Sequence, residues 1–501
     1  MKVQQQKSIS LPPALQDFFA SNDPQNQEFK SEISFSIEKR EALVQVLTQQ
    51  YRGFEISIPV QENIEALRSL NSTTVVTGHQ LCLAGGPLFL FYKICSVIAL
   101  AKEQNRKQSS IRYIPVFWMA SEDHDLKEIS EFYFKGEYVQ LGADAKGIAG
   151  EFPTGYFREW LNDLNGQTNE FMELLNRAYS KFEKNADAVR YWVNAVFGED
   201  GLICIDANSS ELKELARPLF ERELQSFFIH DSVERQNAKL RLKGFEPAIN
   251  PRNCNLFIIQ NGTRERLEYG DGEFRTVISN QHYTLEQLSS NLSSISPNVL
   301  CRPLYQESIL PNSVYIGGPG ELAYWIQLEE AFHQAGLDFP KLMHRISATL
   351  VKNRDFEFMQ KHQLDWKELQ WQLQKVKDQM LNALGKYTAT ELQMNAESVM
   401  EKVIHEAKEI DSTLEPWLRA ELKKQLQQWQ QIEGKINKAI QKREENAFAK
   451  LNQIHQFLLP GGKPQERELT LLEASFYFDL KELKSIMCSH APEDLQELLV
   501  V

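Results

Sequence analysis

Residues 73–125 read TTVVTGHQLCLAGGPLFLFYKICSVIALAKEQNRKQSSIRYIPVFWMASEDHD, and this stretch decides the fold of the chain. Its apolar runs at 74–76 and 113–120 each end in polar residues, Thr77-Gly78-His79-Gln80 and Glu122-Asp123-His124-Asp125. A glycine turn and a helix-like segment separate the two runs. This order is typical of two parallel strands joined by a right-handed helical crossover. Because ligands bind outside the carboxyl ends of strands in an open α/β sheet, we expect both polar groups to line a binding crevice.

The strand pattern recurs later in the chain. Apolar runs that continue the pattern of the sheet lie at 202–206, 298–303, 313–316 and 342–346. The run at 313–316 ends in Gly317-Gly318-Pro319-Gly320-Glu321 and enters a predicted helix over 322–335, which repeats the strand–glycine–helix design of the opening stretch. We therefore predict an α/β fold with a parallel sheet at its core.

Two segments interrupt the sheet pattern with short strands and turns. The first, 131–200, contains a predicted helix over 167–196. The second, 235–297, contains strand-like pieces at 255–260 and 274–279, and Asn261-Gly262 indicates a tight hairpin turn. We interpret both segments as insertions between strands of the sheet.

The spacing of apolar residues changes after residue 352. Apolar residues then recur every three or four positions, as in Trp366, Leu369, Leu373, Val376, Met380 and Leu384, and again in Leu422, Leu426, Trp429, Ile432, Ile436 and Ile440. Gly385 and Pro416 interrupt this spacing. We predict long antiparallel helices or a coiled coil that projects from the sheet domain. The alternative is a helical bundle folded back on the core.

These patterns predict seven segments along the chain. They are 1–130 (N-terminal helices and the first half of the core), 131–200 (first insertion), 201–234 (core), 235–297 (second insertion), 298–352 (second half of the core), 353–459 (helical coiled coil) and 460–501 (a C-terminal segment that packs back on the body).

Composition excludes several classes of protein. A formal net charge of −13 argues against a broad nucleic-acid-binding surface, which needs clustered Lys and Arg. The six cysteines form no CxxC pair, so we expect reduced thiols in a cytoplasmic protein rather than disulfides or a zinc site. Residues 81–101 are long enough to cross a bilayer, but they contain Gly85-Gly86-Pro87 and Lys93. We therefore predict a loop and a buried helix there, and no membrane span.

The polar residues of the two strand–helix junctions are candidates for chemistry. Glycines after a strand let backbone N–H groups approach an anion, although tight turns alone also explain them. His79 is suited to contact a phosphate or a developing charge, or it is an ordinary turn histidine. Lys93 either reaches an acidic ligand or pairs with Asp123 or Glu122, since an unpaired ammonium in an apolar helix is costly.

The residues of 122–125 are of types that bind metals, but no further triplet of ligands stands at a known spacing. We expect this cluster to orient a substrate amine and expect no tightly bound metal.

Taken together, the motifs resemble one family. Thr77-Gly78-His79-Gln80, Gly85-Gly86-Pro87-Leu88 with Tyr92-Lys93, Pro115 to Asp125, Tyr315 to Glu321 and Pro460 to Arg467 are similar to the bacillithiol biosynthesis cysteine-adding family, BshC. The resemblance spans nearly the whole chain. The family usually has Gln at the position of His79.

This resemblance implies a Rossmann-like core with two connecting-peptide insertions and a coiled coil that forms a homodimer. It also implies the addition of cysteine, through an amide bond, to the amine of glucosaminyl malate. By similarity to cysteine ligases of the class I synthetase type, ATP, with or without Mg²⁺, would activate the carboxylate. A second nucleotide pocket near the base of the coiled coil would use Lys463 and Arg467.

The resemblance and the residues together suggest roles. The candidate catalytic residues are Glu122, Asp123 and His124, which would orient the attacking amine or the cysteine amino group, and His79. The residues expected to contact substrate are Thr77, Gly78, Gln80, Gly86, Lys93, Gly318, Glu321 and Tyr324. Of these, Gly86 and Lys93 would hold the malate carboxylates or a phosphate.

Two other classes of function remain open. A nucleotide-binding coiled-coil scaffold without catalysis would use the sheet for a ligand and the helices for a partner. A metal-dependent hydrolase would depend only on the cluster at 122–125.

Overall fold

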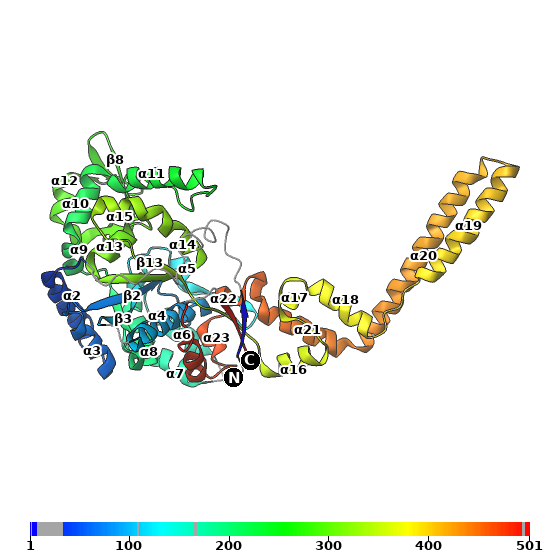
Figure 1. Cartoon of the computed structure of the whole chain (residues 1–501), viewed down its shortest axis with the longest axis horizontal. Coiled ribbons are helices and arrows are strands. Elements are labelled where there is room, and N and C mark those ends of the chain that lie inside the picture. The colour runs from blue at the N-terminus through cyan, green and yellow to red at the C-terminus, as the bar shows by residue number, and fades with distance from the viewer. Residues whose placement is uncertain (2, 8–33, 108–109, 165–167, 493–495) are drawn as a thin grey trace. The chain divides into compact units, whose positions relative to one another are not determined.

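The computed structural model describes residues 1, 3–7, 34–107, 110–164, 168–492 and 496–501 (Figure 1). The chain forms two compact units. One consists of Met1–Leu350 together with Gln465–Val501, and the other consists of Val351–Pro464. Two parts of the predicted helical segments, residues 8–33 and Gln167, lie outside the described residues.

The first unit contains a five-stranded parallel sheet with the strand order β13-β12-β2-β3-β6. Its strands are β2 (Ser72–His79), β3 (Arg112–Met119), β6 (Ile203–Asp206), β12 (Asn312–Gly317) and β13 (Lys341–His344). Counted along the chain, this is the 3-2-1-4-5 order of a Rossmann fold, so the predicted Rossmann-like parallel core is confirmed. The order reverses between β2 and β12, and the carboxyl ends of these two strands therefore form the switch point of the sheet.

Helix α4 (Leu88–Arg106) joins β2 to β3 and accounts for the long apolar segment. It contacts β2 and β3, and it also contacts α22 (Gln465–Glu468) and α24 (Leu480–Met487) from the C-terminal segment. Because neighbours cover both sides of α4, its apolar residues are buried around most of its circumference. Among the described residues, no helix combines the length and the apolar character that a membrane crossing requires.

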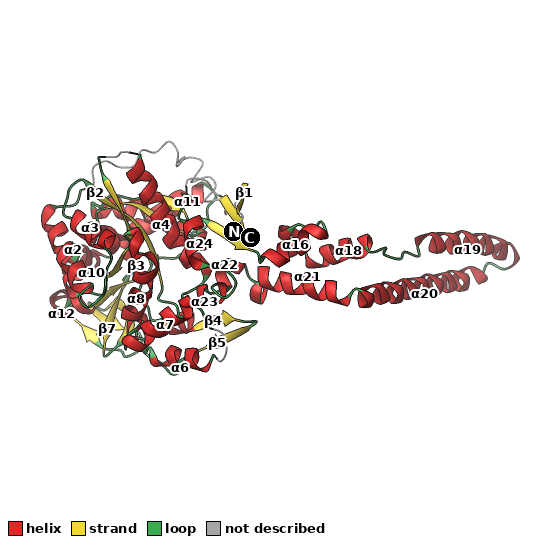
Figure 2. Cartoon of the chain, turned by 90° about the horizontal axis from the view of Figure 1, so that it is seen from below, coloured by secondary structure: helices red, strands yellow, loops and turns green. Residues whose placement is uncertain are grey.

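The residues between β3 and β6 form a hairpin and helices. Their elements are α5 (Leu126–Ser130), β4 (Glu131–Phe134), β5 (Glu137–Gln140), α6 (Gly155–Asp163), α7 (Glu170–Lys181) and α8 (Asn185–Phe197). Helix α8 contacts β6 of the central sheet, and α6 packs on α7 (Figure 2). The bounds assigned to this first insertion stay a prediction.

The second predicted insertion contributes an antiparallel sheet with the order β10-β9-β8-β7-β11. The strands are β7 (Leu256–Gln260), β8 (Thr263–Gly270), β9 (Glu273–Thr276), β10 (His282–Tyr283) and β11 (Ile295–Pro297). Asn261 and Gly262 both have positive φ angles and join β7 to β8, as the sequence predicted for a tight hairpin. Strand β8 was not predicted, because its sequence TRERLEYG lacks an apolar run and buries only Leu267.

The prediction of a strand at residues 298–303 is wrong. These residues lead into helix α13 (Cys301–Ile309) instead of another strand. The side chain of Asn298 accepts hydrogen bonds from the backbone N–H groups of Leu300 and Cys301, both at 2.9 Å, and so caps the start of this helix. An apolar run of six residues is too short to separate a buried helix from a buried strand.

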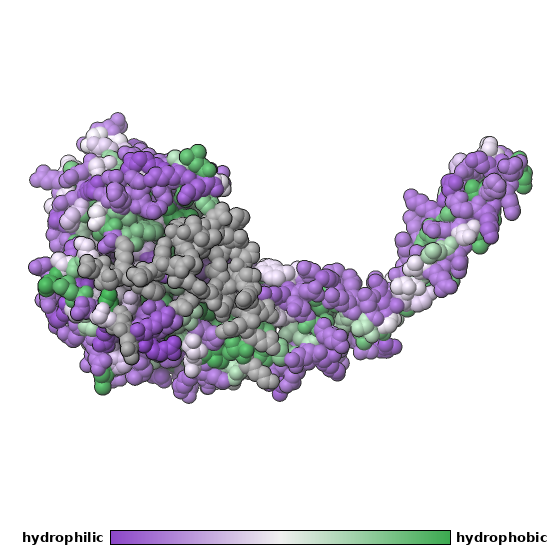
Figure 3. Space-filling model, in the orientation of Figure 1, coloured by the Kyte–Doolittle hydropathy of each residue, from purple (hydrophilic) through white to green (hydrophobic). Residues whose placement is uncertain are grey.

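The second unit is helical. Its helices are α16 (Asn353–Lys361), α17 (Trp366–Trp371), α18 (Leu373–Ala383), α19 (Thr390–Ile410), α20 (Leu414–Arg443) and α21 (Glu445–Leu458). Helices α19 and α20 pack on each other as a helical hairpin, in which hydrophobic residues are interspersed on a mostly hydrophilic surface (Figure 3). Pro416 does not interrupt α20, because it lies in the first turn, where no backbone N–H is required.

The two ends of the chain meet in a small sheet of the first unit. Strand β15 (Gln496–Val500) pairs antiparallel with β1 (Val3–Lys7) and parallel with β14 (Ser347–Leu350). The N- and C-termini therefore lie side by side (Figure 1). This sheet places the C-terminal segment with the first unit.

We predict that Gly201→Ala destabilises the first unit. Gly201 has a φ of +76°, and an added Cβ would lie 2.4 Å from Nδ2 of Asn63, which donates a 2.7 Å hydrogen bond to the Gly201 carbonyl. The strained backbone and the weakened hydrogen bond should lower the free energy of unfolding by about 2–3 kcal/mol, measured by urea denaturation. Gly155→Ala is the matched control, since its added Cβ meets only the end of Arg158 at 3.7 Å. Equal stability of the two variants would contradict the prediction.

Candidate active site

A cavity of about 1000 Å³ opens at the carboxyl ends of β2, β3 and β12 in the first unit. Residues 248–252 of the second predicted insertion, strand β8 and helix α22 complete its walls. The cavity therefore lies at the switch point of the sheet, where doubly wound folds bind their ligands.

Most of the predicted site residues meet in this cavity. Those that line it are Gly78, His79, Gln80, Lys93, Glu122, Asp123, His124, Gly318, Glu321, Tyr324 and Arg467. Thr77 lies outside the lining, because its hydroxyl donates a 2.8 Å hydrogen bond to the Ile316 carbonyl and joins β2 to β12. Lys463 belongs to the second unit, whereas Arg467 belongs to the first.

Gly86 does not line the cavity, and its backbone is already engaged. Its N–H donates to the Leu83 carbonyl at 2.9 Å, and its carbonyl accepts from the N–H of Leu471, also at 2.9 Å. Gly86 has a φ of +70° and belongs to a tight turn against the C-terminal segment. The geometry gives no support to Gly86 as a holder of malate carboxylates or of a phosphate.

Lys93 pairs with a carboxylate, which is one of the two roles that the sequence left open, but the partner is Glu321 rather than Asp123 or Glu122. Its Nζ lies 2.7 Å from Oε1 of Glu321 and also donates to the Gly78 carbonyl. Burial lowers the pKa of Lys93, and the charge of Glu321 opposes that effect. Burial works against ionisation of Glu321, but Lys93 and the N–H of Gly318 hold the pKa of Glu321 below its ordinary value. The pair links the ends of β2 and β12.

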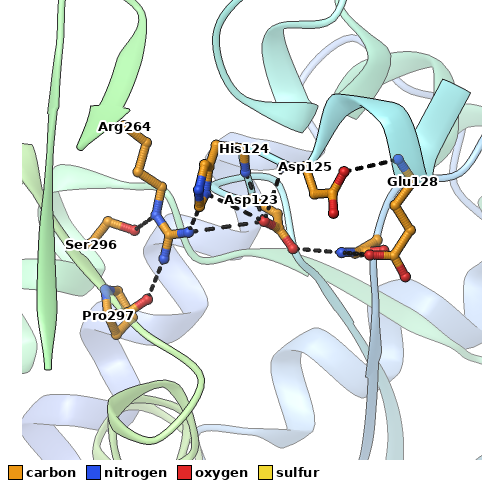
Figure 4. A network of polar contacts seen from close by, with 8 residues as sticks. Asp123, His124, Asp125, Glu128, Arg264, Ser296 and Pro297 are labelled. Atoms are coloured by element: carbon orange, nitrogen blue, oxygen red, sulfur yellow. Dashed lines mark hydrogen bonds and ion pairs between the residues drawn. The ribbon is translucent and has the colours of Figure 1, made fainter. Parts of the chain in front are cut away.

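Asp123 is the centre of a network of polar contacts (Figure 4). Its Oδ1 accepts hydrogen bonds from the N–H groups of His124, at 2.7 Å, and Asp125, at 3.3 Å, and its Oδ2 accepts from Nε2 of Gln80 at 2.6 Å. Burial works against ionisation, but the hydrogen bond from Gln80 and the charge of Arg264 hold the pKa of Asp123 below its ordinary value. Asp123 is therefore an ionised carboxylate whose oxygens are already occupied.

His124 is held by Arg264, which the sequence did not single out. Nη1 of Arg264 lies 2.9 Å from Nδ1 of His124, and the guanidinium stacks 3.9 Å above the ring of Phe257. Because an arginine nitrogen only donates, Nδ1 must accept, and the neutral imidazole then carries its proton on Nε2. Burial and the charge of Arg264 lower the pKa of His124, which favours this neutral form.

Glu122 pairs with a lysine from helix α9 (Ser210–Leu215). Nζ of Lys213 lies 2.7 Å from Oε1 of Glu122, and it also donates to Oδ1 of Asn208 at 2.8 Å. The side chain of Lys213 is fully buried. No sequence pattern marked Lys213, because it stands in a polar stretch and is brought to Glu122 only by the fold.

His79 lies against aromatic and basic neighbours. Its ring contacts that of Phe89 at a centroid distance of 4.9 Å and a tilt of 60°, and Nε2 lies 4.0 Å from the sulfur of Cys82. Burial, reinforced by the nearby charge of Lys93, lowers the pKa of His79 to about 3. The imidazole is therefore neutral at physiological pH and offers a hydrogen bond rather than a positive charge.

Arg302 is a cation in the cavity without a carboxylate partner among the described residues. Its guanidinium lies about 6 Å from the rings of Trp118, Tyr315 and Trp325, and Nη2 is 3.4 Å from the Tyr324 hydroxyl. In the sequence, Arg302 is marked only as an arginine within the run at 298–303, which the strand pattern assigns to the sheet.

The lining of the cavity is basic although the chain is acidic. Seven Lys and Arg side chains and four Asp and Glu side chains line it, while the whole chain has a net charge of −13. Arg345, also in the lining, is neutralised by a bidentate pair with Glu466 at 2.6 and 2.8 Å. The excess of positive charge, with Arg302 unneutralised, fits an anionic ligand.

The cluster at 122–125 does not converge on a common point. Glu122 faces Lys213, Asp123 accepts from Gln80, and Oδ1 of Asp125 caps α5 through a 3.0 Å hydrogen bond from the N–H of Glu128. Within the part of the chain that the structure describes, no group of three His, Cys, Asp or Glu side chains is placed to hold a metal ion.

Comparisons with known proteins cover nearly the whole chain. A family model described as "Bacillithiol biosynthesis BshC, N-terminal Rossmann-like domain" matches residues 5–346, and one described as "Bacillithiol biosynthesis BshC, C-terminal coiled-coil domain" matches residues 348–500. Similar proteins carry the name "Putative cysteine ligase BshC". The one from Flavobacterium psychrophilum is 34% identical over 92% of this chain and 88% of its own length. The one from Flavobacterium johnsoniae is 33% identical over 92% and 89%.

We predict that His79 makes the protein less stable in mild acid. The folded-state pKa of about 3 lies below the ordinary value of 6.5, so between pH 7 and pH 5 the unfolded chain binds a proton that the folded chain does not. Stability is therefore lost as the pH falls through this window, by about 1–2 kcal/mol from this group. His79→Gln should reduce the change in the free energy of unfolding between pH 7 and pH 5 by that amount. His405→Gln, at an exposed histidine of α19 that makes no ion pair with the described residues, is the control, and equal profiles for the two variants would refute the prediction.

Proposed function

The chain belongs to the bacillithiol biosynthesis BshC family, and on that premise we propose that it is an ATP-dependent cysteine ligase. The reaction joins the carboxyl group of cysteine, through an amide bond, to the amine of glucosaminyl malate. The observation that supports the proposal is the basic lining of the cavity at the switch point, in a chain whose net charge is acidic.

Arg302 is the residue that we assign to the malate part of the substrate. Malate carries two carboxylates, and Arg302 offers a guanidinium that makes no ion pair with a carboxylate of the described residues; its Nη1 donates to Oε1 of Gln306 at 3.1 Å. Its aromatic surroundings exclude water from part of the guanidinium and thereby strengthen a charge-assisted hydrogen bond. In this assignment Arg302, and not Gly86, holds the malate carboxylates. Lys93 positions Glu321 and the end of β2.

The residues present also fit a nucleotide phosphate. Arg252 and Arg467 line the cavity, are exposed, and have no ion-pair partner among the described residues. When bound, ATP would supply the activation of the cysteine carboxyl group. Arg467 would keep its expected role as a phosphate contact, now in the cavity of the first unit.

We also propose that the protein forms a homodimer through the α19–α20 hairpin. Large hydrophobic side chains on this hairpin are exposed in the single chain, among them Met394, Val399, Ile410 and Trp417. A second copy of the hairpin would cover them.

The six cysteines are all free, which supports the expected cytoplasmic location.

Thiol metabolite profiling of a deletion strain tests the proposed function. Loss of the ligase should abolish bacillithiol and cause glucosaminyl malate to accumulate, because the substrate amine is no longer acylated. The purified protein should consume ATP only when cysteine and glucosaminyl malate are both present. Normal bacillithiol in a strain without a second copy of the gene would refute the proposal, and nucleotide binding without turnover would favour the scaffold instead.

We predict that Arg302→Gln weakens the binding of glucosaminyl malate. A hydrogen bond to a charged group contributes about 1.5–3 kcal/mol, so the KM for this substrate should rise about 10- to 100-fold. The KM for cysteine should stay within about twofold, because cysteine does not carry the malate group. The exposed control Arg52→Gln should leave both values unchanged. An unchanged KM for glucosaminyl malate in a folded Arg302→Gln protein would remove the assignment.

A further inference from the structure

The orientation of the Gln80 side-chain amide is fixed by its neighbours. Its nitrogen lies 2.6 Å from Oδ2 of Asp123 and 2.7 Å from Oε2 of Glu128. Asp123 is ionised and only accepts hydrogen bonds, so the amide group must turn its NH₂ toward this pair of carboxyl groups. The oxygen Oε1 of Gln80 consequently points away from them.

That oxygen has no hydrogen-bond partner in the described part of the protein, although it is buried and its residue lines the cavity. A buried acceptor without a donor costs about 1–3 kcal/mol. A ligand that places an N–H group against Oε1 would recover this free energy. The two adjacent carboxyl groups make the surroundings negative, which favours an ammonium over a neutral donor.

Glu128 differs from the other two carboxylates near Gln80. Asp123 accepts three hydrogen bonds, and Asp125, whose Oδ1 accepts the N–H of Glu128 at the start of α5, does not line the cavity. Oε2 of Glu128 accepts from Gln80, whereas its Oε1 accepts no hydrogen bond from the described residues. Glu128 therefore has an oxygen available in the cavity lining.

We propose that Gln80 and Glu128 form the amine subsite of the ligase, in which Oε1 of Gln80 accepts an N–H of the attacking ammonium and Glu128 removes its proton. This proposal rests on the proposed function and names a catalytic base that the sequence did not reveal. Asp123 is then a positioning residue, because it fixes the orientation of Gln80 and does not itself offer a free oxygen to the substrate.

The charges around Glu128 suit it to this role. Burial raises the pKa of Glu128, the hydrogen bond from Gln80 opposes that effect, and the like charges of Asp125 and Asp123 raise the pKa further. A carboxylate with a raised pKa is a better proton acceptor, which is what a general base requires.

The proposed step balances in atoms and electrons. The ammonium of glucosaminyl malate gives one proton to Glu128, and its lone pair then attacks the carbonyl carbon of the activated cysteine. The new C–N bond forms, and the bond from that carbon to the oxygen of the activating phosphate group breaks. The leaving oxygen takes the electron pair, and the second proton lost by the nitrogen departs with it or to water.

Glu128→Gln tests the proton transfer with an isosteric side chain. Near neutral pH the kcat should fall about 100-fold, the magnitude typical of a lost general base, while the KM for cysteine stays unchanged. The loss should shrink as the pH rises above the pKa of the substrate amine, because the amine is then deprotonated without Glu128. Glu137→Gln, an exposed glutamate on β5, is the matched control. A loss in kcat that is the same at every pH, or no loss, would overturn the role of Glu128.

Gln80→Met tests the acceptor, and calorimetric binding separates this test from catalysis. The wild-type protein should bind glucosaminyl malate about tenfold more tightly than its N-acetylated analogue, which lacks the ammonium, and Gln80→Met should reduce this difference, because the acceptor is lost while the charges of Asp123 and Glu128 stay. Gln61→Ala, an exposed glutamine, should retain it. If the wild type fails to form the amide but keeps the binding preference, the proposed function fails and the amine subsite stands. Equal binding of both ligands to the wild type would overturn the subsite.

Discussion

The parallel pairing of β2 with β12 is the constraint on which the site depends. These strands are separated by more than two hundred residues, yet the Thr77 hydroxyl donates to the Ile316 carbonyl and the backbone registers align Val76 with Tyr315. Their carboxyl ends therefore lie together, and Lys93 can reach both the Gly78 carbonyl and Glu321. Because the order of the sheet reverses here, the connections that leave β2 and β12 lead away in opposite directions, and the cavity opens at this point.

The cavity lining contains two chemically different groups of residues. One is Arg302, a cation that makes no ion pair with a carboxylate of the described residues and has aromatic rings beside it. The other is Gln80, which donates to Asp123 and Glu128 and whose Oε1 has no hydrogen-bond donor among the described residues. A ligand with both carboxylates and an amine would satisfy both groups. The proposed substrate, glucosaminyl malate, carries both kinds of group.

The sequence predicted much of the fold because the core strands are strongly patterned. The apolar runs of β2, β3 and β12 end in glycine or polar residues, and both features are local. The errors arose where local signals are ambiguous. Residues 298–303 look like a strand but lead into helix α13, where Asn298 accepts hydrogen bonds from the N–H groups of Leu300 and Cys301. Strand β8 is polar and was missed, since pairing with β7 and β9 rather than burial holds it.

The sequence by itself determined the parallel α/β core, the helical region after it and the polar groups at the strand ends, because periodicity and turn residues act over short distances. Only the tertiary structure decided the partners of those groups. It paired Lys93 with Glu321 and Glu122 with Lys213, and it brought Arg264 to His124. The physical reason is that a buried charge is stabilised by whichever opposite charge or hydrogen-bonding group lies within a few ångströms, and strand order rather than distance along the chain sets that neighbour.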